Sequence, residues 1–207
     1  MIEIEKLCKS YGEQIIYKDL NLSFKEQELT CIVGASGCGK TTLLRLIAGL
    51  ESYDSGEIRG INDKKIAYVF QEDRLMPWLS VGENIEYVLL SYCDKVQIRK
   101  KVEDLLRLVQ LMGYENMPIH QLSGGMQRRV AIARALAYDS DVLLLDEPFK
   151  GLDDKLKWHV LEEMQQFLKE KNRTAICVTH DLEVAERVAC QIDIEKLIYS
   201  EAIQDKI

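Results

Sequence analysis

The chain opens with two segments in which apolar and polar residues alternate. The apolar positions are Ile2, Ile4 and Leu7 in the first segment, and Leu20, Leu22 and Phe24 in the second. A period of two places the apolar side chains of an extended strand on one of its faces. The pattern therefore predicts half-buried antiparallel strands within the first 30 residues.

Four later segments are short and almost wholly apolar, which is typical of strands buried on both faces. They cover residues 29–33, 66–70, 142–145 and 175–178. Strands of this kind occur in parallel sheets that are covered by helices. We therefore expect a parallel sheet at the centre of the molecule.

Between these runs, apolar residues recur at helical spacing. One set is Ile98, Val102, Leu105 and Val109, and another is Leu156, Val160, Met164 and Phe167. Residues three and four apart lie on one face of a helix, so both segments are predicted to be amphipathic helices. Together with the apolar runs, they indicate an α/β fold without repeats or linkers.

Polar residues stand within two positions of the end of each apolar run. They are Gly34, Gln71, Asp146 with Glu147, and His180. In open α/β sheets, ligands bind just beyond the carboxyl ends of the strands. We therefore expect these residues to converge on one crevice.

The segment 34–41 reads G-x-x-x-x-G-K-[ST] and lies between a predicted strand and a helix that begins at Thr42. Its glycines let successive N–H groups point inward around an anion, and the helix N-terminus adds its dipole. Lys40 brings a positive charge to the β- and γ-phosphates, and the Thr41 hydroxyl is a ligand for Mg²⁺. The alternative is a glycine-rich turn without a ligand. The candidate nucleotide-binding residues are Gly34, Ala35, Ser36, Gly37, Cys38, Gly39, Lys40, Thr41 and Thr42.

The apolar run at 142–145 ends in two acids, Asp146 and Glu147. Asp146 at the strand tip is placed to hold Mg²⁺, directly or through water. Glu147 is then placed to polarise an attacking water as a general base. The alternative is a strand that simply becomes polar at its exit.

A second glycine pair follows Ser123 in the sequence Leu-Ser-Gly-Gly-Met at 122–126. Ser123 is a natural N-cap, and Gly124 and Gly125 leave N–H groups accessible at the positive end of the helix. An ordinary capped surface helix is the alternative, but it would need neither glycine. Since the chain already has one phosphate loop, we interpret this segment as half of a site that a second subunit completes.

Composition narrows the function further. The 207 residues carry a net charge of −7 without a basic block, which argues against nucleic acid as a partner. Six scattered cysteines form no C-x-x-C pair, so we expect small apolar side chains rather than metal ligands. No signal peptide and no apolar stretch approaching 18 residues is found, so any membrane role is expected to act through a partner.

The motifs at 34–41, 122–126 and 146–147, with His180, resemble those of the nucleotide-binding subunit of an ABC transporter, and the resemblance covers almost the whole chain. It implies a P-loop NTPase fold with a RecA-like core, an N-terminal antiparallel β-subdomain and an inserted α-helical subdomain. The single domain would span 1–207, with the helical subdomain at about 75–138. The sequence FQEDRLMPWLSVGENI at 70–85 is similar to ATPase subunits of nitrate/sulfonate/taurine-type importers.

The resemblance also implies roles for further residues. Gln71 matches a glutamine that senses Mg²⁺ and the γ-phosphate, and His180 matches a histidine that contacts the γ-phosphate. Asp153 matches an aspartate that bridges two subunits, and Tyr11 resembles the aromatic residue that stacks on adenine. A structural histidine and a packing tyrosine are the alternatives.

The expected partners are ATP with Mg²⁺, an identical or second ATPase subunit, transmembrane permease subunits bound through 71–85 and, indirectly, a solute-binding protein. The apolar residues Leu75, Met76, Pro77, Trp78 and Leu79 suit a groove for a permease helix, although internal packing of a helical lobe is the alternative. The chain would then lie on the cytoplasmic face of a membrane and hydrolyse ATP to import a small anion. Its rival is a soluble ABC-type ATPase without a permease.

Two features depart from the family pattern. Lys150 stands where a small neutral residue is usual, and residues 190–207 match poorly. A nucleotide kinase built on the same loop would not explain Ser123, Gly124 and Gly125.

Overall fold

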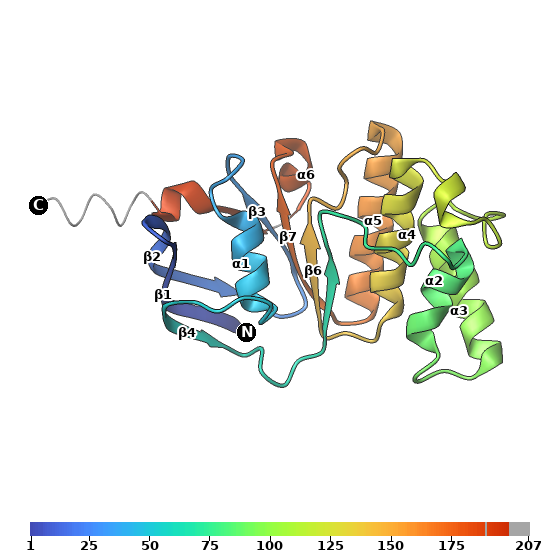
Figure 1. The fold of residues 1–207 in the computed structure, drawn as a ribbon, viewed down its shortest axis with the longest axis horizontal. Helices are drawn as coiled ribbons and strands as arrows, with labels where there is room; N and C mark the ends of the chain where they lie inside the picture. The colour runs from blue at the N-terminus through green and yellow to red at the C-terminus, as the bar shows by residue number, and fades with distance from the viewer. Residues whose placement is uncertain (189, 199–207) are drawn as a thin grey trace, which may run out of the picture.

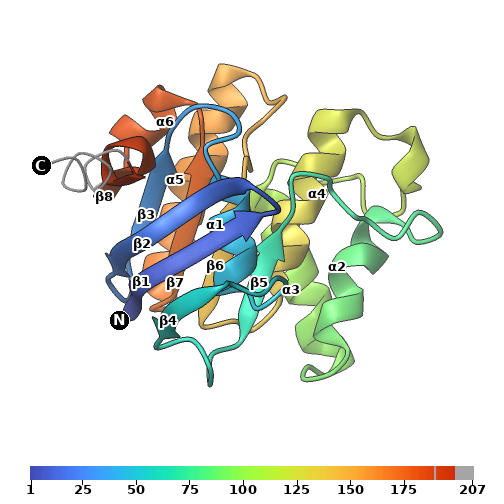
Figure 2. The same ribbon diagram turned by 60° about the vertical axis from the view of Figure 1, so that its left-hand side comes forward.

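The computed structural model describes residues 1–188 and 190–198, which form two β-sheets with helices between and beside them (Figures 1 and 2). In Figure 1 the layers run from the N-terminal sheet through α1 (Lys40–Ile47) to the central sheet, and then to the remaining long helices.

The N-terminal sheet is antiparallel and has the strand order β2-β1-β4. Its strands are β1 (Ile2–Tyr11), β2 (Gln14–Phe24) and β4 (Ser55–Arg59). The predicted alternation is confirmed, because Ile2 pairs with Phe24, and Ile4 pairs with Leu22. The sequence reasoning missed β4, whose five residues include a single large apolar side chain, Ile58.

The central sheet is parallel and has the order β5-β6-β7-β3-β8. Its strands are β3 (Leu29–Val33), β5 (Ile66–Val69), β6 (Val142–Asp146), β7 (Thr174–Thr179) and β8 (Cys190–Asp193). The first four confirm the four apolar runs. The short edge strand β8 was not predicted, and the poorly matching segment therefore contributes a strand, while 199–207 lie outside the described residues.

Helices α2 (Val81–Leu89), α3 (Lys95–Leu108) and α4 (Gly124–Ala137) lie between β5 and β6 in the chain and pack on one another. Helix α5 (Asp154–Glu170) precedes β7, and the short α6 (Leu182–Glu186) follows it. The periodicities over α3 and α5 predicted those helices, whereas α2 was not recognised. This architecture confirms the predicted fold class, with its antiparallel N-terminal sheet, parallel core and helical insert.

The parallel sheet separates two apolar cores, because successive residues of each strand face opposite sides. Leu144 of β6 and Ile176 of β7 face α1 and the N-terminal sheet. Their neighbours Leu143 and Cys177 face the core that contains α4 and α5. The strands are fixed from both faces, so the residues at their carboxyl ends are held in place.

Candidate functional site

The expected convergence at the carboxyl ends of the parallel strands is present for Gln71, Glu147 and His180, whereas Gly34 and Asp146 do not line the pocket themselves. A pocket of about 200 Å³ opens there. Its lining residues are Ile16, Ser36, Gly37, Gly39, Lys40, Thr41, Thr42, Gln71, Glu147 and His180. Sequence reasoning missed Ile16, which β2 brings to the pocket from the N-terminal sheet and which carries no polar group to signal a role.

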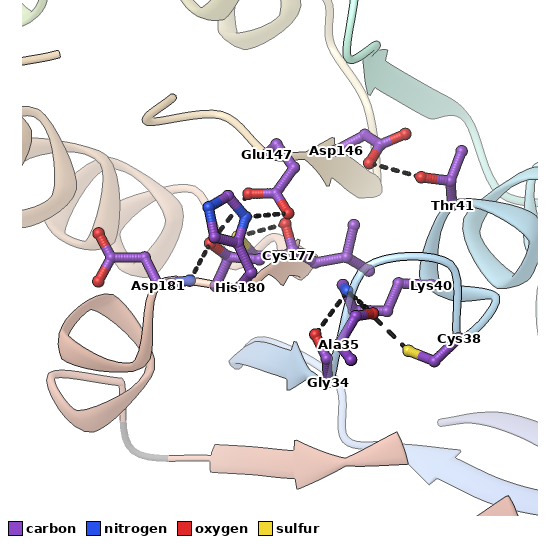
Figure 3. A network of polar contacts seen from close by, with 12 residues as sticks. Gly34, Ala35, Cys38, Lys40, Thr41, Asp146, Glu147, Cys177, His180 and Asp181 are labelled. Carbon is purple, nitrogen blue, oxygen red and sulfur yellow. Dashed lines mark hydrogen bonds and ion pairs between the residues drawn. The ribbon is translucent and has the colours of Figure 1, made fainter. Parts of the chain in front are cut away.

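The loop before α1 curls around the side chain of Lys40. The Lys40 ammonium donates to the carbonyl oxygens of Gly34 at 2.7 Å and Ala35 at 2.8 Å (Figure 3). Only 7% of Lys40 is exposed. Gly39, with a φ of 100°, leads directly into α1, whose first residues Lys40, Thr41 and Thr42 line the pocket with the positive end of the helix dipole. The arrangement concentrates positive potential where an anion would enter.

Thr41 and Asp146 bring two oxygen ligands together beside this loop. The Thr41 hydroxyl donates to Asp146 Oδ1 at 3.0 Å (Figure 3). Asp146 is 2% exposed, and burial raises the pKa of its carboxyl above the usual value. In residues 1–188 and 190–198, no three His, Cys, Asp or Glu side chains group as a metal cage. Two hard oxygen ligands suit Mg²⁺ held jointly with phosphates, because Mg²⁺ seldom uses an all-protein cage.

Glu147 is anchored by two residues at the end of β7, Thr179 and the following His180. Its carboxylate accepts from the Thr179 hydroxyl at 3.2 Å. It also lies 2.8 Å from His180 Nδ1 (Figure 3). The backbone of Glu147 is left-handed, with a φ of 51°, which is unusual for a residue with a side chain. The His180 ring is largely exposed, whereas the Glu147 side chain is only 14% exposed. A half-buried carboxylate and an exposed imidazole thus line one pocket.

The segments around Ser123 and Asp153 lie apart from this pocket in the single chain. Ser123 accepts from the Met126 amide at 3.3 Å, as the predicted N-cap, and Asp153 caps α5 by accepting from Leu156 at 3.0 Å. Neither they nor Gly124 and Gly125 line it. The two segments meet instead: a Cβ added to Gly125 would lie 3.1 Å from the Gly151 carbonyl oxygen. These glycines therefore form a second, separate surface.

Tyr11 lies at the end of β1 and does not line the pocket. Its hydroxyl donates to the Glu51 carboxylate, and the Lys9 ammonium lies 4.6 Å from the centre of its ring. The ring is 45% exposed. It is accessible to a flat partner, although the described contacts hold it on the N-terminal sheet.

Two residues that sequence reasoning assigned no role are tied to the site by hydrogen bonds. Arg128 of α4 donates to the main-chain oxygens of Gln71 and Glu147. Glu195, beyond β8, accepts from the Ala35 amide at 2.6 Å. Arg128 lies only five residues after Ser123, and this proximity to the predicted motif is a signal that could have identified it. Nothing in the local sequence marks Glu195.

The apolar run at 75–79 is divided between the interior and the surface. Leu75 packs against the larger core, whereas the Trp78 side chain is 78% exposed. Asn84 of α2 fixes the run by accepting from the Met76 amide at 2.9 Å and donating to its carbonyl oxygen at 3.1 Å. Internal packing thus explains Leu75 but not Trp78. In the described parts of the chain, no helix has both the length and the apolar character needed to cross a bilayer.

Comparison with known proteins gives consistent results. Residues 17–150 match the family model described as ABC transporter. The chain is 44% identical over 195 residues to the spermidine/putrescine import ATP-binding protein PotA of Acetivibrio thermocellus, covering 89% of this chain and 55% of that protein. It is 42% identical over 201 residues to the sulfate/thiosulfate import ATP-binding protein CysA of Synechococcus elongatus, covering 92% and 58%. The chain thus spans little more than half the length of these curated relatives.

Among solved structures, the chain resembles the ATP-binding cassette MJ0796 in a dimeric, post-hydrolysis state bound to ADP and Pi. The TM-score is 0.80 at 34% identity, covering 89% of this chain and 90% of that one.

Proposed function

Because the chain belongs to the ABC transporter family, we propose that it is the subunit that binds and hydrolyses ATP to drive transport across a membrane. The observation that carries this proposal is the convergence of Lys40, Thr41, Glu147 and His180 on one pocket. The printed names of PotA and CysA as import ATP-binding proteins support it, as does the ADP and Pi bound to the cassette MJ0796.

The phosphates of ATP would lie in the loop before α1. Gly37, Gly39 and Lys40 line the pocket, and the ammonium of Lys40 is held 2.7 Å from the Gly34 carbonyl oxygen. A negatively charged phosphate would draw this ammonium partly away from its carbonyl partners. Donors and dipoles fixed in advance stabilise the charge that develops on the γ-phosphate during transfer.

The residues that would hold Mg²⁺ are Thr41, Asp146 and Gln71. The Thr41 hydroxyl oxygen lies 3.0 Å from Asp146 Oδ1, and Gln71 lines the pocket together with Thr41. Bound there, Mg²⁺ would neutralise phosphate charge. Hydroxyl, carboxylate and amide oxygens are the ligands that this ion prefers, which supports the assignment.

Glu147 would act as the general base. Its carboxylate, restrained by Thr179 and His180, lies at the pocket wall, where it would accept a proton from the water that attacks the γ-phosphate. The exposed ring of His180 would contact the γ-phosphate and keep Glu147 aligned.

The surface formed by Ser123, Gly124, Gly125 and Asp153 would complete the site of a second subunit. A single chain holds this surface away from its own pocket, as a site shared between two copies requires. ATP would then hold two subunits together, and hydrolysis would release them. The dimeric state of the cassette MJ0796 supports this arrangement.

Residues 71–85, with the exposed Trp78, would bind the permease and so keep the subunit at the cytoplasmic face of the membrane. An extracytoplasmic solute-binding protein would act through that permease. The narrower prediction of a nitrate, sulfonate or taurine substrate finds no support in the names of these two relatives, which are import ATP-binding proteins for spermidine/putrescine and for sulfate/thiosulfate. Import of a small solute is what we propose.

Replacing Glu147 with glutamine tests the catalytic assignment. Glu147→Gln keeps the shape and a hydrogen-bond acceptor but is a poor base, so we expect ATP binding to persist while turnover falls by about 10³-fold. Steady-state phosphate release and a fluorescent-ATP titration measure the two quantities. Full turnover in this variant would refute the general-base role.

Co-purification with a permease separates transport from the rival soluble ATPase. The variant Trp78→Ala should reduce permease capture. Its basal ATP hydrolysis serves as the control and should stay unchanged. Capture of no membrane protein by the wild-type subunit would favour the soluble alternative.

A further inference from the structure

Arg128 is a buried arginine at the centre of the molecule, 3% exposed, on the second turn of α4. Its guanidinium makes six hydrogen bonds. The acceptors are Pro148 O at 3.2 Å, Phe70 O at 2.5 Å, Gln71 O at 3.4 Å, Asp73 Oδ1 at 2.9 Å, Asp146 O at 2.6 Å and Glu147 O at 2.6 Å. One side chain thus joins α4 to the ends of β5 and β6.

Five of these six acceptors are main-chain carbonyls. Carbonyls just past the end of a strand have left the sheet ladder and, when buried, need another donor. The planar guanidinium offers five N–H groups in a fixed fork, whereas a lysine ammonium offers three on a flexible stem. Only an arginine can serve both strand ends at once.

The carbonyls that Arg128 binds flank the two side chains proposed to act on the γ-phosphate and its water. Gln71 follows β5, and Glu147 follows β6. The left-handed backbone of Glu147, with its φ of 51°, is strained for a residue with a Cβ and persists only where the surroundings fix it. The Glu147 amide is held by Val178 O at 3.0 Å, and its carbonyl by Arg128.

Arg128 also lies five residues after Ser123, on the helix that Ser123 caps. The segment proposed to contact a second subunit's ATP is therefore joined through one rigid side chain to both pocket residues.

We propose that Arg128 is a positioning residue, which fixes Glu147 and Gln71 relative to each other and to α4. It touches no reacting atom. The rate of hydrolysis depends on its planar guanidinium. Nucleotide binding does not depend on it, because binding uses the loop before α1. The inference rests on the proposed ATPase function.

The test compares Arg128→Lys with Arg173→Lys. Arg173 is a matched control: it is 7% exposed and donates to Leu136 O at 3.1 Å and Asp139 Oδ1 at 3.3 Å, and it does not line the pocket. For Arg128→Lys we expect kcat to fall about 10- to 100-fold while the Kd for a fluorescent ATP analogue changes less than about threefold. Arg173→Lys should lower the melting temperature but keep kcat.

Chemical rescue distinguishes positioning from a general loss of stability. Millimolar guanidinium added to Arg128→Ala should restore part of the turnover, and methylammonium should not, because only guanidinium has the planar fork. If Arg128→Ala does not fold, Arg128→Lys decides alone. A kcat within threefold of wild type in folded Arg128→Lys overturns the proposal, and so does a parallel loss of kcat and ATP affinity.

Hydrogen exchange without nucleotide provides a readout that does not depend on activity. The amides of Glu147 and Lys150, which donate to Val178 O and Glu147 O, should exchange about tenfold faster in Arg128→Lys and not in Arg173→Lys. Unchanged exchange overturns the positioning role. If exchange is faster in Arg128→Lys but the wild-type protein hydrolyses no ATP, the positioning role stands and the proposed ATPase function is refuted.

Discussion

Replacing Gly39 with alanine would test whether the loop around Lys40 packs closely against β2. Gly39 has a φ of 100°, in the region that side chains avoid. A Cβ there would lie 2.7 Å from Ile16 Cγ2 and 2.7 Å from the Tyr17 hydroxyl. The Tyr17 ring is 1% exposed and its hydroxyl donates to Gly39 O at 2.8 Å, so it has no free space into which to withdraw.

The expected loss of stability follows from two separate terms. A left-handed backbone costs a residue with a Cβ about 1–2 kcal/mol. Overpacking a well-filled core costs about 1–3 kcal/mol more. Gly39→Ala should therefore lower the free energy of unfolding by about 2–5 kcal/mol, which for a chain of this size corresponds to a drop of about 4–20 °C in melting temperature.

Gly37→Ala is the matched control. Its φ is 85°, but a Cβ there meets no atom within 4 Å. It should show only the backbone term of about 1–2 kcal/mol. Urea unfolding of both variants without nucleotide measures the difference. If Gly39→Ala is no less stable than Gly37→Ala, the loop is not in close contact with β2.

Two further predictions concern the base of ATP and the response to acid. If Tyr11 stacks on adenine, Tyr11→Phe should keep ATP affinity within about twofold and Tyr11→Ala should lose about tenfold; equal losses in a fluorescent-ATP titration would contradict stacking. Burial alone would raise the pKa of Asp181, but the hydrogen bond from Lys157 at 2.8 Å contributes to lowering it below its usual value. Asp181 therefore stabilises the fold above its unfolded pKa of about 3.9 and loses this effect as the pH falls through the folded pKa. Urea unfolding should show Asp181→Asn less stable by about 1 kcal/mol at pH 7, with a gap that shrinks below about pH 4. The control Asp154→Asn replaces a side chain that is 82% exposed and should show almost no difference from wild type. A stability gap for Asp181→Asn that does not shrink as the pH is lowered below about 4 would contradict the assignment.

Much of the core was predictable because its signals are local. The apolar runs that became β3, β5, β6 and β7 each lie within six residues. Both faces of a buried parallel strand are covered by helices, so its side chains are apolar throughout. Since parallel strands end at one edge, the convergence of Gln71, Glu147 and His180 followed from their spacing alone.

The weaker elements were not predictable in the same way. Strand β4 has one large apolar residue, and β8 is a four-residue edge strand. Each is a strand because a neighbouring strand offers it a ladder of hydrogen bonds, and that neighbour is distant in the chain: Ile58 pairs with Ile4. Pairing partners at such separations leave no trace in a local window.

The amino-acid sequence by itself determined the family, the glycine-rich loop before α1 and the order of the polar groups along the strand ends, because each of these is a property of a short run of residues. Only the tertiary structure showed that Arg128 joins three segments, since its acceptors lie up to 58 residues away. It likewise placed Ile16 in the pocket and held Ser123 outside it. A hydrogen-bond donor gains its partners from folding, so its role depends on where the chain brings carbonyl groups rather than on its own neighbours.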